Sequence, residues 1–171
     1  CALPISLMEL SDTNSPLLRE LSIKAPGTFQ HSMQVANLAE AATYRIGGNS
    51  LLVRAGALYH DIGKMASPLY FIENQTSGIN PHDDLSFEES ASIIIGHVIG
   101  GIEIARKNKL PDLIIDFIRT HHGTSMVQYF YQSFLKNFPM EIVDEDDFRY
   151  PGPLPFSKET AVLMMADSVE A

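Results

Sequence analysis

Histidines are few in this acidic chain, with six among 171 residues, so each position carries information. His60 and Asp61 are adjacent within the string ALYHDIGK. An imidazole nitrogen and a carboxylate oxygen side by side can bind one metal, and the second carboxylate oxygen can bridge to another. Alone, such a dipeptide more often ends a helix and makes local hydrogen bonds. The positions of the other histidines and aspartates therefore distinguish a metal site from a dipeptide that only ends a helix.

Two more histidines lie on apolar segments. His31 falls on the apolar face of the helix expected before His60, where a single histidine is more often a hydrogen-bonded core residue. His97 is surrounded by the string IIIGHVIGG. An imidazole without a partner would be costly in such a segment. Both positions favour a shared polar partner in the interior.

The second half of the chain adds a histidine pair and an aspartate. On a continuous helix the side chains of His121 and His122 would diverge by about 100°. Gly123 follows directly and can end the helix, which would let both rings turn to one centre. Asp167 lies in the apolar string AVLMMADSV and would be poorly placed if unpaired. Together the set predicts a metal site with these ligands: His31, His60, Asp61, His97, His121, His122 and Asp167.

Histidine-rich ligation suits transition metals better than magnesium. Two metals about 3.5–4 Å apart lower the pKa of a bridging water and clamp phosphate oxygens. Lys64, one turn after Asp61, could hold a phosphate oxygen or be a solvated lysine near a helix end, and its position within HDIGK beside a metal pair favours the phosphate role. Asp61 and Lys64 are the predicted catalytic residues.

Three further residues are weaker substrate-binding candidates. His82, in the string INPHDD, is expected to be a loop residue rather than a metal ligand, and it could border a substrate. Arg149 and Tyr150, in FRYPGP, could contact phosphate and base. For Arg149, pairing with the acidic run at residues 144–147 is an equally good explanation.

The elements that must position these residues are helices. Ser15 and Pro16 have the pattern of a helix start, and the expected helix stops near residues 25–27. Thr28 is expected to cap the next helix, whose apolar face would include His31, Val35, Leu38 and Ala42. A third helix is expected over residues 51–61. Residues 74–86 are polar and rich in turn formers, which predicts a surface loop.

Ser86 and Glu89 have the spacing of a capping box before the helix that carries His97. The glycines at 100 and 101 are expected to bend or break that helix. Further helices are expected from Pro111 to the histidine pair, over residues 126–138, and after Ser157 as an N-cap. Residues 139–155 are expected to be an acidic, proline-rich excursion. No convincing set of alternating strands is present, so the predicted fold class is all-α.

Length and composition bound the function. A chain of this size favours one compact domain, which we divide into a lead-in over residues 1–15 and a domain over residues 16–171. Twelve Lys and Arg against 21 Asp and Glu give a net charge of −9, which argues against a DNA- or RNA-binding surface. Cys1 is the single cysteine, so a disulfide scaffold is excluded. The apolar runs are too short to span a membrane, and the missing initial Met suggests an excised fragment.

The order His31, His60–Asp61, Asp167 resembles the HD superfamily of metal-dependent phosphohydrolases. The additional histidines resemble the dinuclear branch of that superfamily. Longer strings are similar to the cytoplasmic domain of the seven-transmembrane HD proteins, from about Leu17 to the chain end: GALYHDIGKM, HHGTSMVQYFY, FRYPGPLPFSKETA and MMADSVEA. The resemblance implies a helical HD bundle around a dinuclear site, with the last helix truncated here.

The same resemblance implies a bacterial phosphodiesterase that opens cyclic di-AMP to pApA with two divalent metals, iron or manganese, and a metal-activated hydroxide. It implies that one metal takes His31, His60, Asp61 and Asp167. The other would take His97, His121, His122 and the second oxygen of Asp61. It also implies a membrane-embedded parent chain, with this domain tethered at the cytoplasmic face, and it allows homo-oligomers.

Alternatives from other classes remain open. Cyclic di-GMP phosphodiesterases of this superfamily carry a GYP motif soon after the paired histidines, whereas GTSMVQ follows here. Mononuclear nucleotide phosphatases would not need His97, His121 and His122. A di-iron oxygenase on the same scaffold, and a signalling module without catalysis, are the other two alternatives.

Overall fold

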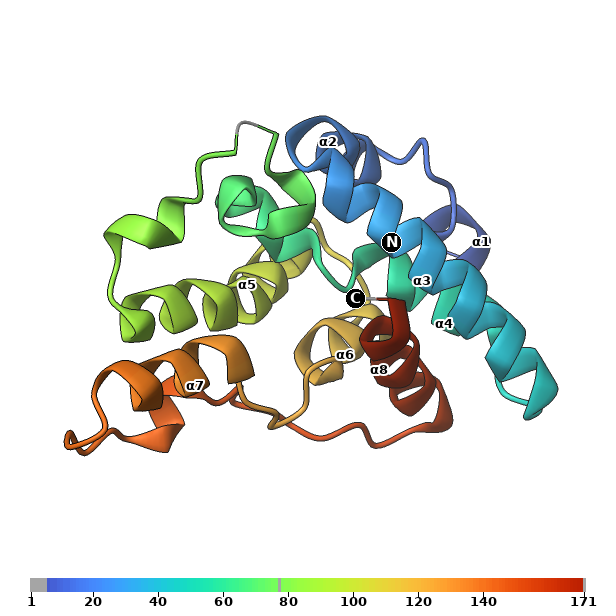
Figure 1. Ribbon diagram of the computed structural model, residues 1–171. Helices are drawn as coiled ribbons and strands as arrows, with labels where there is room; N and C mark the ends of the chain where they lie inside the picture. The colour runs from blue at the N-terminus through green and yellow to red at the C-terminus, as the bar shows by residue number, and fades with distance from the viewer. Residues whose placement is uncertain (1–5, 77, 171) are drawn as a thin grey trace.

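The computed structural model describes residues 6–76 and 78–170, and over these residues it is helical (Figure 1). It confirms the predicted all-α fold class. The only extended pairing among the described residues is an isolated bridge between Met126 and Arg149. The α-helices are α1 (Leu7–Leu10), α2 (Pro16–Lys24), α3 (Pro26–Arg45), α4 (Ser50–Tyr59), α5 (Phe87–Lys107), α6 (Asp112–Thr120), α7 (Gln128–Asn137) and α8 (Lys158–Glu170).

Short 3₁₀ helices lie in two of the connections, between α4 and α5 and between α7 and α8. They are η1 (Ile62–Ala66), η2 (Pro68–Tyr70), η3 (Ile72–Asn74), η4 (Pro81–Asp84) and η5 (Glu145–Phe148). None of the described helices is both long enough and apolar enough to cross a bilayer. The predictions for Cys1, for the first five residues of the lead-in and for the final Ala171 fall outside the described residues.

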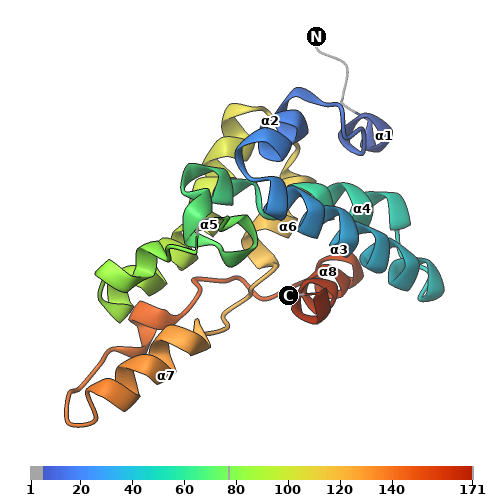
Figure 2. The same cartoon turned by 45° about the horizontal axis from the view of Figure 1, so that its top comes forward.

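The main core lies between α3, α4, α6 and α8. Helix α3 packs along α4 and α8, and α4 also contacts α6 (Figure 1). Fully buried apolar side chains fill the space between them, among them Leu58, Phe117 and Leu163. Burying one such side chain contributes roughly 1.5–3 kcal/mol to folding. Helix α7 stands apart from this core and packs with η5 against α5, around Phe134 and Phe148 (Figure 2).

Several predicted helix ends are confirmed. Ser86 accepts from the backbone N–H of Glu89, while the Glu89 carboxylate accepts from the backbone N–H of Ser86, which is a complete capping box at the start of α5. Ser157 accepts from the backbone N–H of Thr160 at the start of α8. Such caps satisfy backbone donors that the first turn leaves free.

The prediction that Thr28 caps α3 is wrong. The helix begins two residues earlier, at Pro26, because proline at the first helical position has no N–H to satisfy. The predicted apolar face of α3 is also rotated. Leu38 and Ala42 are exposed, whereas Val35, Ala36 and Ala39 are buried. Small residues on the buried face let α3 approach its neighbours closely.

The predicted break at Gly100 and Gly101 is wrong as well, since α5 runs without interruption to Lys107. Gly101 serves close packing instead, whereas a Cβ atom on Gly100 would meet nothing within 4 Å. A Cβ atom on Gly63 would lie 1.8 Å from the carbonyl oxygen of His97 and 2.6 Å from the nitrogen of Gly101. Glycine at position 63 therefore lets the turn after Asp61 rest directly on α5, beside His97.

Candidate metal centre

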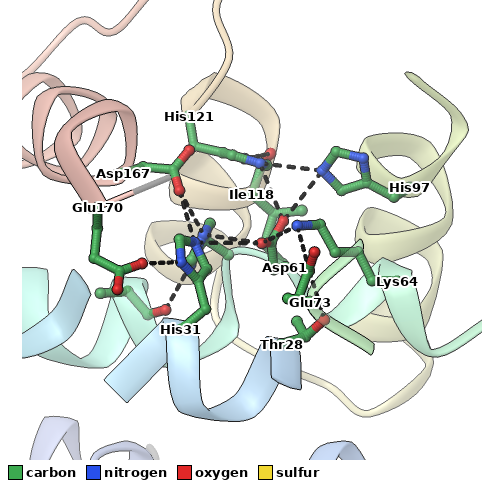
Figure 3. A network of polar contacts seen from close by, with 12 residues as sticks. Thr28, His31, Asp61, Lys64, Glu73, His97, Ile118, His121, Asp167 and Glu170 are labelled. Carbon is green, nitrogen blue, oxygen red and sulfur yellow. Dashed lines mark hydrogen bonds and ion pairs between the residues drawn. The ribbon is translucent and has the colours of Figure 1, made fainter. Parts of the chain in front are cut away.

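The seven predicted ligands come together where α3, α4, α5, α6 and α8 meet. Figure 3 shows His31, Asp61, His97, His121 and Asp167 from this set. His31 projects from α3 and Asp167 from α8, while His97 lies in the middle of α5. His60 and Asp61 directly follow α4, and His121 and His122 directly follow α6. Gly123, with φ of +54°, turns the chain after the histidine pair as expected from the sequence. Residues far apart in the chain thus share one interior site.

Asp61 lies at the centre of this site, with 1% of its surface exposed. Its Oδ2 atom faces the Nε2 atoms of His60, at 3.3 Å, and His31, at 3.8 Å. Its Oδ1 atom faces the Nε2 atoms of His97, at 3.2 Å, and His121, at 3.4 Å. The two oxygens of one carboxylate therefore point to two different sets of histidines.

Two groups of donor atoms result, each with its atoms within 4.8 Å of one another. In the first group Asp167 Oδ1 lies 2.9 Å from His31 Nε2 and 3.4 Å from His60 Nε2. The first group consists of His31, His60 and Asp167, and the second of Asp61, His97, His121 and His122.

Backbone carbonyls orient three of the histidines. In each, Nδ1 donates to the carbonyl oxygen three residues earlier in the chain, because a carbonyl can only accept. This places a proton on Nδ1 and turns Nε2 toward Asp61, the orientation found in many metal-binding histidines. The pairs are His60 with Ala57, His97 with Ile94, and His121 with Ile118.

The other two histidines are held by side chains. His31 Nδ1 contacts the Glu170 carboxylate. The ring of His122 stacks on Tyr150, with centroids 4.2 Å apart and planes 21° from parallel. Glu170 was not predicted as a site residue. Its spacing of three from Asp167 on α8 places both carboxylates on one helix face, which is the signal the sequence offered.

Two buried polar atoms at the centre lack a hydrogen-bond partner. Among the described residues, His60 Nε2 and Asp61 Oδ1 are both shielded from solvent and unpaired. Leaving such a group unsatisfied costs roughly 1–3 kcal/mol, and a cation between the donor groups would satisfy both. Imidazole nitrogens with carboxylate oxygens suit divalent transition metals. The residues present therefore fit divalent metal binding.

The charges at the site are strongly coupled. Burial opposes protonation of His60, yet the Asp61 and Asp167 carboxylates outweigh it and raise the pKa of His60 to about 10. Burial likewise opposes ionisation of Asp61, but His60 and Lys64 hold the pKa of Asp61 well below its usual range. Burial lowers the pKa of His121 and of His122, so both rings are kept neutral. Neutral imidazole is the form that binds a metal.

Lys64 lies at the edge of the same cluster. Its Nζ atom is 2.8 Å from Asp61 Oδ2 and 2.9 Å from Glu73 Oε1. Burial works against the charge, but Asp61 and Glu73 outweigh it and raise the pKa of Lys64, so the amine stays cationic. Glu73 was not predicted as a site residue. It lies on η3 and also accepts from the hydroxyl of Thr28 on α3.

The remaining candidates lie in three different places. Tyr150 is buried beside His122, as described above. Arg149 pairs with Glu145, at 3.2 Å, and donates to the carbonyl of Thr124, which agrees with the alternative interpretation of local pairing. His82 lies on η4, and its Nε2 donates to the carbonyl of Tyr70 at 2.9 Å.

An open cavity of about 450 Å³, called here the metal-site cavity, gives access to this centre. Its volume is within the usual range for ligand sites, about 300–1,000 Å³. It is lined by predicted ligands and by both newly identified carboxylates, including His31, Asp61, Lys64, Glu73, His122, Asp167 and Glu170.

The comparisons with known proteins agree with one another. The HD domain family matches residues 28–171. The chain is 53% identical over 165 residues to the cyclic-di-AMP phosphodiesterase PgpH of Listeria monocytogenes and 49% identical to that of Bacillus subtilis. Each match covers 96% of this chain but 23% of the relative, so the chain spans about a quarter of their length.

A solved structure agrees with these relatives. The crystal structure of the Listeria monocytogenes PgpH HD domain in complex with cyclic-di-AMP superimposes with a TM-score of 0.88 at 52% identity. The match covers 93% of this chain and 73% of that one.

Proposed function

The chain belongs to the HD domain family, and on that premise we propose that it is the catalytic domain of a phosphodiesterase that opens cyclic di-AMP to pApA. The observation that carries the proposal is the position of Asp61. Its two oxygens face two histidine groups, and a cationic lysine contacts it at the edge of an open cavity. The relatives named for this activity and the solved complex support cyclic di-AMP as the substrate.

We propose two divalent transition metals, iron or manganese, as cofactors. His31, His60, Asp61 and Asp167 would hold one, and His97, His121, His122 and Asp61 the other. Bound metals of this kind supply Lewis acidity and make a water nucleophile available at neutral pH.

Side chains of the protein supply the remaining functions. Lys64 would hold a non-bridging oxygen of the scissile phosphate, because its amine is cationic and lies within the lining of the metal-site cavity. Tyr150 would keep the ring of His122 in place by stacking on it. We assign no phosphate contact to Arg149, since acidic neighbours already engage its guanidinium.

We expect Glu170→Gln to weaken metal binding about 10–100-fold, the usual effect of removing an outer partner of a ligating histidine. The amide oxygen can still accept a hydrogen bond from His31 Nδ1. It lacks the negative charge that makes the imidazole a more basic metal ligand. The measurement is competition for manganese against a coloured chelator. Glu103→Gln, an exposed position on α5, is the matched control. Equal affinities in both variants would show that Glu170 plays no such role.

The proposal extends to the cellular setting. The relatives are about four times as long as this chain. We propose that the full protein holds this domain at the inner face of the cell membrane, as in the seven-transmembrane HD proteins it resembles, in an arrangement that allows homo-oligomers. The net charge of −9 argues against a DNA or RNA polymer as the substrate.

Incubation of the metal-loaded protein with cyclic di-AMP tests the proposal. Chromatography should show pApA as the product with manganese or iron, and none after removal of metal by a chelator. Cyclic di-GMP and nucleoside triphosphates should be poor substrates, and oxygen should not be consumed. Preferred turnover of one of these, oxygen consumption, or no turnover with metal bound would contradict the proposal and favour one of the alternatives.

A further inference from the structure

Glu73 is a second anionic partner of the Lys64 amine, and it belongs to neither group of metal-binding atoms. We propose that Glu73 is a positioning residue, which holds the Lys64 ammonium at the metal-site cavity when Asp61 is engaged by metal. The inference rests on the proposed function and adds to it a residue that acts through Lys64. The Glu73 carboxylate lies in the lining of that cavity, with 26% of its side chain exposed.

In the structure, the Lys64 amine lies between two carboxylates. Its Nζ atom is 2.8 Å from Asp61 Oδ2 and 2.9 Å from Glu73 Oε1 (Figure 3). The ring of Phe71 lies 4.9 Å from the same atom and adds no full charge. Over residues 6–76 and 78–170, no other carboxylate oxygen lies within 4.0 Å of this amine. Asp61 and Glu73 therefore share the work of holding it.

Metal binding would change the balance between these two carboxylates. Asp61 Oδ2 also faces the Nε2 atoms of His60 and His31, so its lone pairs are needed for a metal in the first donor group. An ammonium group beside divalent cations is repelled, and the repulsion is strong where little water screens it. The pull of Asp61 on Lys64 is then offset. Glu73, which has no metal-binding role, is the carboxylate that still attracts the ammonium.

Contacts with the start of α3 fix the Glu73 carboxylate in place. The hydroxyl of Thr28 donates to Glu73 Oε1 at 3.0 Å, and the side-chain amide of Asn74 donates to that hydroxyl at 2.8 Å. A Cβ atom on Gly27 would lie 1.9 Å from the carbonyl oxygen of Glu73, so α3 rests directly on η3. Because α3 also carries His31, one helix sets both a metal ligand and the partner of Lys64.

A purely structural role for Glu73 makes a different prediction. If the carboxylate only attaches η3 to α3 through Thr28, its substitution should have the same effect whether or not residue 64 carries a charge. If Glu73 positions the ammonium, its effect should disappear when Lys64 is absent. Residues that act through one another show such non-additive effects.

The test is a double-mutant cycle of Glu73→Gln and Lys64→Met in the manganese-loaded protein. The amide keeps an oxygen for Thr28 and removes the charge. We expect Glu73→Gln to lower kcat for cyclic di-AMP about tenfold, because the ammonium is present but no longer held in position. KM should change little, and in the Lys64→Met background kcat should not fall further. Glu20→Gln, which removes the partner of the exposed Lys24, is the matched control and should leave kcat unchanged.

Chemical labelling gives a readout that needs no substrate. In the manganese-loaded protein, acetic anhydride should modify Lys64 several-fold faster in Glu73→Gln than in the unchanged protein, because the amine is released to solvent. Mass spectrometry measures this rate, with Lys24 as the internal reference, and elemental analysis should find equal metal in both proteins.

Equal losses of kcat in both Lys64 backgrounds, or unchanged labelling of Lys64, would overturn the inference. Failure of the proposed function would look different. The unchanged protein would then not turn over cyclic di-AMP, while the labelling of Lys64 would still respond to Glu73→Gln.

Discussion

Asp61→Ala is expected to reduce turnover of cyclic di-AMP by at least about 10³-fold, the scale seen when a central catalytic group is removed. The carboxylate faces His60 and His31 through one oxygen, and His97 and His121 through the other. Its loss takes a ligand from both proposed metals and leaves positive charge without compensation. Metal content, measured by elemental analysis, should fall together with activity.

The fold should survive this change, which makes the experiment informative. The apolar core between α3, α4, α6 and α8 does not depend on the carboxylate. Circular dichroism should therefore show an unchanged helix content. Asp147→Asn, at an exposed position in η5, is the matched control and should keep both activity and metal. An Asp61→Ala protein that stayed folded, held two metals and kept near-normal activity would refute the proposed mechanism.

Local sequence signals were sufficient for most helix boundaries. The capping box of Ser86 and Glu89 depends on residues three apart, and the turn at Gly123 depends on one residue. Such patterns involve residues within a few positions of one another, so the sequence alone reveals them. The metal-ligand candidates were also recognisable locally, because each is a polar residue within its own apolar segment.

Features that depend on a distant partner were not predictable in this way. Thr28 has the residue type of an N-cap, yet its hydroxyl hydrogen-bonds the side chains of Glu73 and Asn74, 45 and 46 positions later. Gly100 and Gly101 resemble a helix break, yet α5 continues through them, and Gly101 packs against the turn at Gly63. Helix propensity is a weak prior that such tertiary contacts override.

The same distinction separates the predicted site residues from the missed ones. Aspartates and histidines in apolar strings are conspicuous, whereas Glu73 and Glu170 lie in strings of mixed polarity, FIENQ and DSVEA. Their contacts with Lys64 and His31 are formed by folding, and apart from the spacing of Glu170 from Asp167 no local pattern marks them. The sequence therefore indicates which groups could bind a metal, while the structure shows which groups hold those ligands in place.

Lys64→Met is expected to lower the turnover of cyclic di-AMP about 10²–10³-fold, the usual effect of removing one donor that stabilises charge in a transition state. Unlike Asp61→Ala, it should leave metal content unchanged. The lysine contacts Asp61 Oδ2 but contributes no lone pair to a metal while it is protonated. Removing a cation beside two metals relieves repulsion and does not weaken their binding.

Metal content therefore decides between two roles for Lys64. If the lysine acts on the phosphate, Lys64→Met keeps both metals and loses rate, and Lys64→Arg restores part of it because the charge is retained. If the lysine only neutralises Asp61, activity and metal content change together. Lys24→Met, at an exposed lysine paired with Glu20, is the control for loss of a surface charge and should change neither quantity. Parallel loss of metal and rate in Lys64→Met would overturn the assignment of Lys64 to the phosphate and leave it as a residue that positions Asp61.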